Sequence, residues 1–169
     1  MLLLSGLLGA IIGSVVTASF NVWKFHRDEL SSRIDELCQA MAVAADRASD
    51  YWSQYYSTPS FEQAKAEAKL AASQNLVDGL YAEIRGSLAP TDAEHLDDLM
   101  SSFVDAMTGG TFTEAGRQAD ATRIALAPQL SSMIIVAVRR SHRRTLPFRR
   151  IIKGFQAYKR HQAQVAKLD

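Results

Sequence analysis

The side chains that most often perform chemistry are few in this sequence and lie far apart. The histidines are His26, His95, His142 and His161, and the single cysteine is Cys38. They follow no His/Cys metal-ligand spacing, and the sequence contains neither a Gly-rich phosphate loop nor a Gly-x-Ser-x-Gly nucleophile motif. We therefore expect no catalytic residue, no metal and no cofactor. An enzyme whose site one sequence does not reveal is the least favoured alternative.

Two local clusters of reactive residue types have a simpler structural interpretation. The carboxylates gather around one expected helix: Asp92, Glu94, Asp97, Asp98 and Asp105. Acidic residues favour the first turn of a helix, so a solvated face is expected there rather than a metal or catalytic pair. The aromatic cluster consists of Tyr51, Trp52, Tyr55 and Tyr56, which we expect to form core and rim, with a site for a base or small ligand as the alternative. The lone Cys38 is expected in the core, and no intrachain disulfide is possible.

The N-terminal segment predicts a membrane anchor over residues 1–24. No side chain from Met1 to Trp23 is charged, and about 20 apolar residues match the hydrocarbon core of a bilayer. Lys24, His26 and Arg27 follow at once, which predicts a single pass through the inner (plasma) membrane with the N-terminus outside and the body in the cytoplasm. A signal peptide cleaved near Ala18 is the alternative, but it lacks a basic start.

Small residues on this anchor, and a heptad seam after it, predict a homo-oligomer. Small side chains recur at i+4 steps and let helices approach closely in lipid: Gly6, Gly9, Ala10, Gly13 and Ser14. The seam begins with Leu30, Ile34, Leu37 and Met41 and runs to Tyr55 at alternating spacings of four and three. The same spacing suits packing inside a bundle, so the seam lies either within the domain or between subunits.

The remaining pattern predicts an all-α fold, in which the anchor continues into a cytoplasmic antiparallel bundle of about four helices over residues 25–138. Neither Gly nor Pro interrupts residues 14–58, which predicts one continuous rod. Three capping boxes would open the later helices: Ser60 with Gln63, Thr91 with Glu94, and Thr111 with Glu114. Pro128 is expected to kink or restart the last helix. Short loops make consecutive helices antiparallel, so the chain would return to the membrane side.

Charge is divided unevenly along the chain. Residues 1–138 hold 9 Lys and Arg against 17 Asp and Glu, whereas residues 139–169 hold 10 against 1. We expect 139–169 to form a basic amphipathic tail that binds an anionic membrane surface. The residues expected to make that contact are Arg139, Arg140, Arg143, Arg144, Arg149, Arg150, Lys153 and Phe155. Nucleic acid and the acidic body of a neighbouring subunit are the alternative partners.

A glycine-rich anchor, residues 9–13, that leads through Asn21 into Asp28-Glu29-Leu30 and a helical body resembles the short membrane accessory and effector proteins of bacterial antiviral systems. Among them is the accessory protein of type VI-B CRISPR, with a HEPN-like bundle and a pore-like assembly. No Arg stands at the HEPN nuclease spacing before any His, so the resemblance implies no ribonuclease site. Our hypothesis is a non-enzymatic, self-associating membrane protein that acts as a pore-forming or membrane-perturbing effector or as a scaffold. The alternative is a membrane-tethered binding module for nucleic acid or a protein partner.

Overall fold

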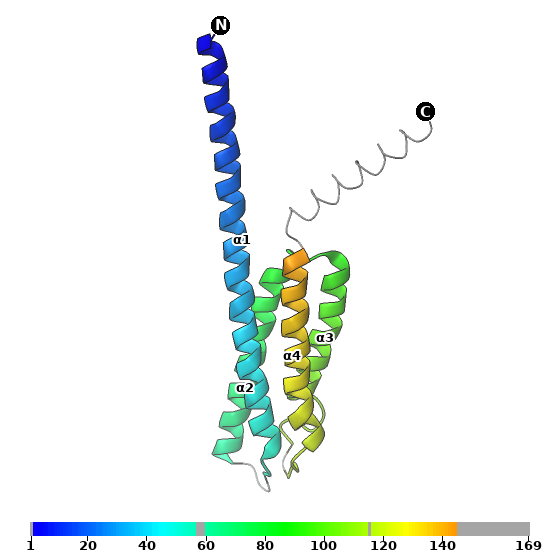
Figure 1. The fold of residues 1–169 in the computed structure, drawn as a ribbon. Helices are drawn as coiled ribbons and strands as arrows, with labels where there is room; N and C mark the ends of the chain where they lie inside the picture. The colour runs from blue at the N-terminus through cyan, green and yellow to red at the C-terminus, as the bar shows by residue number, and fades with distance from the viewer. Residues whose placement is uncertain (1, 57–59, 115, 145–169) are drawn as a thin grey trace, which may run out of the picture.

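The fold is all-α, as predicted. A computed structural model describes residues 2–56, 60–114 and 116–144, with residues 2–12 described by their backbone alone. These ranges contain four helices and no strand: α1 (Leu2–Ser53), α2 (Phe61–Arg85), α3 (Pro90–Thr108) and α4 (Ala121–Arg144). The helices run alternately down and up, and α1 packs against α2 and α4 while α4 also packs against α3 (Figure 1).

Helix α1 is the continuous rod that the absence of Gly and Pro predicted. Its 52 residues extend about 78 Å at 1.5 Å per residue. Only the second half belongs to the bundle, and the first half projects beyond it into open space (Figure 1). Side chains from Gly13 to Glu29 are exposed apart from the partly exposed Trp23, and burial begins at Leu30.

The heptad seam of α1 packs inside the chain. Ile34, Leu37 and Met41 are between 0% and 3% exposed, and Leu30 lies partly buried at the edge of the same core. Side chains this deeply covered cannot also contact a second copy unless the bundle opens. Of the two alternatives for the seam, this structure therefore shows packing within the domain.

Of the three predicted capping boxes, the one at Ser60 is confirmed in its N-cap half, whereas the Gln63 side chain donates to Glu67 and does not bond back to Ser60. The Ser60 side chain accepts a hydrogen bond from the Gln63 backbone N–H at 3.1 Å and begins α2. The box at Thr91 is wrong, because α3 begins one residue earlier with Pro90 at its first position, where the missing N–H costs nothing.

The box at Thr111 is also wrong, and residues 109–114 and 116–120 lie in a loop. Backbone φ is positive at Gly110, Thr113 and Gly116, which is incompatible with a helix start there. Helix α4 begins at Ala121 instead, where the Asp120 carboxylate accepts from the backbone N–H groups of Thr122 and Arg123 at 2.9 and 3.1 Å. An Asp in this position satisfies N–H groups that have no partner within the helix.

Pro128 lies inside α4, which continues through it as one helix, so the restart that was one of the two expected effects does not occur. Proline has no N–H, so the carbonyl of Ile124, four residues earlier, loses its helical partner. The Ser49 hydroxyl on α1 donates to that carbonyl at 3.0 Å. A side chain of the neighbouring helix thus replaces the hydrogen bond that Pro128 removes.

Helix α4 continues to Arg144, so the predicted boundary between body and tail at 138/139 falls inside it. Arg139, Arg140, Arg143 and Arg144 belong to the bundle's last helix. The other predicted tail contacts lie outside the described residues: Arg149, Arg150, Lys153 and Phe155.

Candidate functional site

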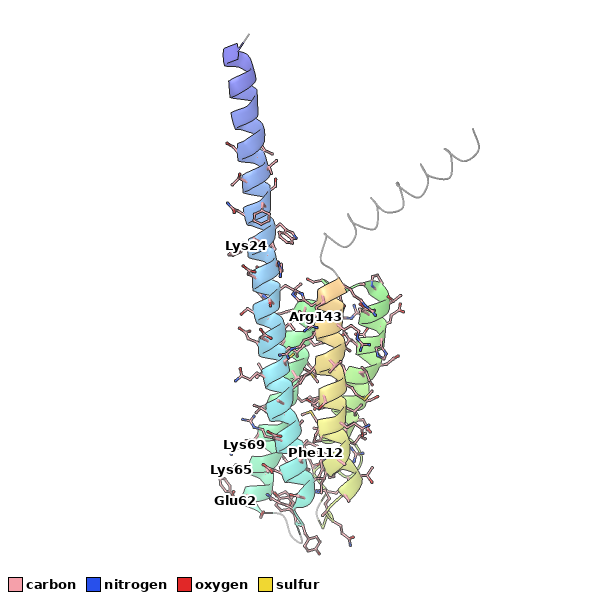
Figure 2. The ribbon with its side chains drawn as sticks, in the orientation of Figure 1. Lys24, Glu62, Lys65, Lys69, Phe112 and Arg143 are labelled. Atoms are coloured by element: carbon pink, nitrogen blue, oxygen red, sulfur yellow. The ribbon has the colours of Figure 1, made fainter. Side chains whose placement is uncertain are left out.

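The end of the bundle from which α1 projects carries a group of basic side chains from two helices. Because α4 is antiparallel to α1, its C-terminus lies beside the point where α1 leaves the bundle, as the positions of Lys24 and Arg143 in Figure 2 illustrate. We call this group the basic collar, and its members are Lys24 and Arg27 on α1 and Arg139, Arg140, Arg143 and Arg144 on α4. Cations at the C-terminus of α4 are also favoured by the helix dipole.

Two collar arginines are partly neutralised within the chain. Arg139 lies 3.4 Å from Asp35, and Arg144 lies 3.5 Å from Asp92. These pairs are more than half exposed on the arginine side, where such contacts contribute little stability. These two arginines thus pair with acidic residues of their own chain, and the alternative of docking on a neighbouring subunit stays a prediction.

The other collar cations have no carboxylate within ion-pair distance among the residues with described side chains: Lys24, Arg27, Arg140 and Arg143. Arg27 lies over the Trp23 ring, 5.7 Å from its centroid. His142 is close to the collar, and burial followed by the charge of Arg27 lowers its pKa, so the imidazole is neutral at pH 7. His142 therefore adds little to the collar's positive charge at neutral pH.

The opposite end of the bundle contains the aromatic cluster, which is core and rim as expected. Tyr51, Trp52 and Tyr56 are 9% exposed or less, whereas Tyr55 is 64% exposed. The Trp52 indole donates to the Met107 carbonyl at 3.0 Å, near the end of α3. The three buried rings close the end of the bundle and offer little free surface for a stacked base, which leaves only the exposed Tyr55 ring accessible.

Arg117, which the sequence analysis did not single out, organises this end. Its guanidinium is buried and lies 4.1 Å from the Tyr51 ring centroid and 4.7 Å from that of Trp52. It donates to the carbonyls of Tyr51 at 2.7 Å and Gln54 at 3.2 Å. These contacts hold the loop before α4 against the end of α1. Their partners lie more than 60 residues away, so no local motif announces them.

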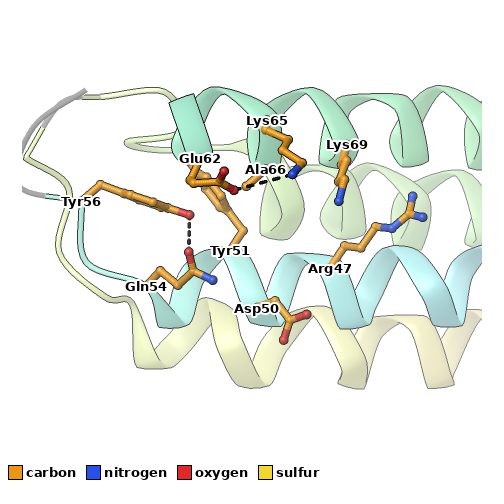
Figure 3. A pocket seen from close by; sticks show the side chains of 9 residues that line it. All are labelled: Arg47, Asp50, Tyr51, Gln54, Tyr56, Glu62, Lys65, Ala66 and Lys69. Carbon is orange, nitrogen blue, oxygen red and sulfur yellow. Dashed lines mark hydrogen bonds and ion pairs between the residues drawn. The ribbon is translucent and has the colours of Figure 1, made fainter. Parts of the chain in front are cut away.

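A hollow of about 390 Å³ lies between α1 and α2 beside the aromatic cluster (Figure 3). Its basic side chains are Arg47 from α1 and Lys65 and Lys69 from α2. Tyr51 and Tyr56 close one end, and the carboxylates of Asp50 and Glu62 stand at the rim. No sequence spacing predicted this group, because the antiparallel pairing of two helices brings it together.

The acidic residues around α3 are less independent than the solvated face that we expected. Asp97 accepts hydrogen bonds from Tyr81 at 2.8 Å and from Arg85 at 2.7 Å, and chiefly the Arg85 guanidinium lowers the Asp97 pKa to about 2. Asp105 pairs with Arg123 at 3.8 Å. Among the residues with described side chains, no three His, Cys, Asp or Glu converge as a metal site would require.

The predicted self-association residues divide between the projecting half of α1, which carries the small residues, and the buried seam from Leu30 to Met41. Gly6, Gly9 and Ala10 are described by backbone alone, and Gly13 and Ser14 are exposed on the projecting half of α1. A Cβ built on Gly13 would meet no atom within 4 Å, so this side of the helix is open. Cys38 lies in the core, where burial raises the pKa of its thiol.

By length and composition, α4 is the one helix among the residues described with side chains that qualifies as a membrane span. It lies towards the C-terminus, whereas the predicted span is at residues 1–24. Ala127, Leu130, Ile134 and Val138 of α4 are buried against the rest of the bundle, and a core helix meets the same criterion. The N-terminal span stays a prediction.

Comparison with protein-family models, with curated proteins and with solved structures gave no match. The resemblance to membrane proteins of antiviral systems stays a prediction.

Proposed function

We propose that the protein is a membrane-anchored interaction protein. In this proposal the first half of α1 spans a bilayer, and the bundle is held below it with the basic collar against anionic head groups. The observation that carries the proposal is the uncovered apolar surface of the projecting half of α1. Its exposed large side chains are Val15, Val16, Phe20, Val22 and Phe25, each between 51% and 68% exposed.

The dimensions of the projecting segment suit a bilayer. Residues 2–23 extend about 33 Å as a helix, close to the roughly 30 Å of the hydrocarbon core. Its backbone hydrogen bonds are made within the helix, which is the condition for a segment that enters lipid. Exposed apolar side chains on a helix that no other element covers would otherwise face water, at a cost of about 25 cal/mol per Å².

The position of the collar supports the same placement of α1 in a bilayer, and its charge indicates on which side of the membrane the bundle lies. Lys24 and Arg27 follow the apolar segment directly, and the end of α4 brings Arg143 to the end of the bundle from which α1 projects, below Lys24 (Figure 2). Each basic group near an anionic leaflet contributes roughly 1 kcal/mol. Cations on this side of the segment favour a cytoplasmic bundle by the positive-inside rule.

The chemistry of the collar favours lipid over nucleic acid. Proteins that grip single strands combine cations with exposed aromatic rings on which bases stack. Residues 130–144 of α4 contain no Phe, Tyr or Trp, and the aromatic rings beside the collar, Phe20, Trp23 and Phe25, belong to α1 at the end of the apolar segment, where membrane proteins place interfacial aromatics. The described part of the collar therefore suits phosphates at a membrane surface.

Self-association of the anchor belongs to the same proposal. The open side of α1 at Gly13, in register with Gly9 in the sequence, would let a second copy approach closely. Assembly would make the protein a scaffold or a membrane-perturbing effector. Replacing Gly9 and Gly13 with Leu should lower the mass of the nanodisc-embedded particle, whereas replacing Ser101 and Ser102 on α3 with Ala should not.

The insertion itself is tested by cysteine labelling of the full chain in vesicles. A Cys38→Ala background removes the native thiol, and Val15→Cys and Ser101→Cys then place one thiol in the proposed span and one on the exposed surface of α3. The vesicles are prepared so that the helical bundle faces the external solution. A membrane-impermeant maleimide should then label Ser101→Cys and leave Val15→Cys unlabelled until SDS dissolves the membrane. Equal labelling of both positions in intact vesicles would refute a transmembrane α1.

A further inference from the structure

The bundle uses its basic residues unequally. Between residues 28 and 138 the chain has seven: Arg33, Arg47, Lys65, Lys69, Arg85, Arg117 and Arg123. Four of them have evident structural roles. Arg33, Arg85 and Arg123 form ion pairs with carboxylates, and Arg117 is buried among aromatic rings. The remaining three all line the hollow between α1 and α2.

The three cations of the hollow come from facing helices. Figure 3 shows Arg47 on α1 and Lys69 on α2 extending into the gap from opposite sides, with Lys65 one helical turn away. Lys65 has a weak ion pair with Glu62, 3.8 Å away, and Arg47 donates to the hydroxyl of Ser73. Among the residues with described side chains, Arg47 and Lys69 have no carboxylate partner.

This arrangement costs free energy in the absence of a partner. Lys65 and Lys69 are four residues apart on one helix face, and like charges at this spacing destabilise a helix. Arg47 adds a third positive charge across the gap, in a body that is otherwise acidic. An anion between the two helices would reverse the sign of these interactions.

We propose that the hollow binds a small, soluble polyanion that carries two or more phosphate groups. Three cations that face one space match several phosphate oxygens, and the Arg47 fork can hold two of them at once. Tyr51 and Tyr56 are almost fully covered, so the site recognises phosphates rather than stacking on a base. The rim carboxylates Asp50 and Glu62 restrict the ligand to one compact enough to stay beside the cations.

The position of the hollow separates this ligand from the membrane. Arg47 lies 23 residues beyond Lys24 on the same helix, a rise of about 35 Å. Head groups in a bilayer at the collar cannot reach that far, so the ligand comes from solution. That the ligand comes from solution rests on the proposed function, which places the bilayer at the collar, whereas anion binding at the hollow does not depend on it.

The test is calorimetric titration of the full chain with tripolyphosphate. The protein is held in nanodiscs of zwitterionic lipid, and 150 mM salt screens diffuse attraction between distant charges. The collar variant Arg140→Gln/Arg143→Gln should retain the binding event of the unaltered chain. In the hollow variant Lys65→Gln/Lys69→Gln, the dissociation constant for tripolyphosphate should rise at least tenfold for each charge-assisted contact that is removed.

Two results would overturn the proposal. One is the absence of any saturable binding by the unaltered chain, and the other is an equal loss in the hollow and collar variants, which would indicate unspecific attraction. Both lysines are exposed, so the hollow variant should fold, with an unfolding midpoint no lower than that of the unaltered chain. Lys69→Arg is a second check, since it keeps the charge and should keep binding within about threefold.

Discussion

The hydrogen bond between Ser49 and Ile124 gives the sharpest test of how α1 and α4 are matched. Pro128 leaves the Ile124 carbonyl without a helical N–H, and the Ser49 hydroxyl donates to it at 3.0 Å. The Ser49→Ala substitution removes that donor and leaves a partly buried carbonyl unsatisfied. An unsatisfied buried group costs about 1–3 kcal/mol, and partial burial places this one near the lower end, about 1 kcal/mol.

A double-mutant cycle separates this effect from a simple loss of packing. In a Pro128→Ala chain, the new backbone N–H can bond to the Ile124 carbonyl in the regular helical way. Ser49→Ala should then cost less than about 0.5 kcal/mol, which gives a coupling energy of roughly 0.5–1 kcal/mol between the two positions.

The assay is urea unfolding of the detergent-solubilised full chain, with the slope of the transition checked for constancy. A loss of about 1 kcal/mol lowers the midpoint by roughly 0.3–1 M urea. Ser102→Ala is the matched control, because the Ser102 hydroxyl donates to a carbonyl of its own helix at the surface and should change little. The reasoning is refuted if Ser49→Ala lowers the free energy of unfolding by the same amount in the chain with Pro128 and in the Pro128→Ala chain.

Two further predictions concern the core and the acid side of the pH range. Trp52→Phe should lower the free energy of unfolding by about 1–3 kcal/mol, measured by urea titration, because the buried Met107 carbonyl loses its donor, whereas Trp23→Phe should leave it unchanged. The folded-state pKa of Asp97 is lowered to about 2 from 3.8, so its contribution to stability is present above pH 4 and is lost as pH falls towards 2. Urea midpoints between pH 4 and pH 2 should therefore fall less steeply for Asp97→Asn than for the unaltered chain, and parallel curves would contradict the assignment.

The features of the fold that depend on residue spacing within one helix were predictable from the sequence. The unbroken run to Thr58 predicted the rod, the seam through Leu37 and Met41 predicted its buried face, and Ser60 with Gln63 predicted the start of α2. Each of these signals acts within one helix, where residue spacing maps directly onto a face or an end. The all-α class follows from the same signals.

The errors arose where local patterns compete with long-range contacts. Thr111 and Glu114 have the spacing of a capping box, but the positive φ of Gly110, Thr113 and Gly116 and the hydrogen bonds of Arg117 impose a loop. Pro128 has the local signature of a break, which a donor from another helix offsets. Arg117 bonds to Tyr51, and Ser49 completes the hydrogen bonding around Pro128. Each of these partners is more than 60 residues away in the sequence, so local residue spacing gave no sign of the contact.

The distribution of unpaired cations links the two proposals. Arg33 and Arg85, at the end of the bundle where α1 enters it, have carboxylate partners on neighbouring helices, so their charge serves the fold. Other cations have no carboxylate partner among the residues with described side chains: Arg140 and Arg143 at the collar, and Arg47 and Lys69 at the hollow. A surface charge without a partner in its own chain adds little to the free energy of folding, but it can bind an anion from outside the chain. The collar can obtain that anion from a membrane, whereas the hollow, about 35 Å away, can obtain it only from solution. The Gln variants at the two ends should therefore respond to different anions, and a polyphosphate effect confined to the hollow would show that the two surfaces act separately.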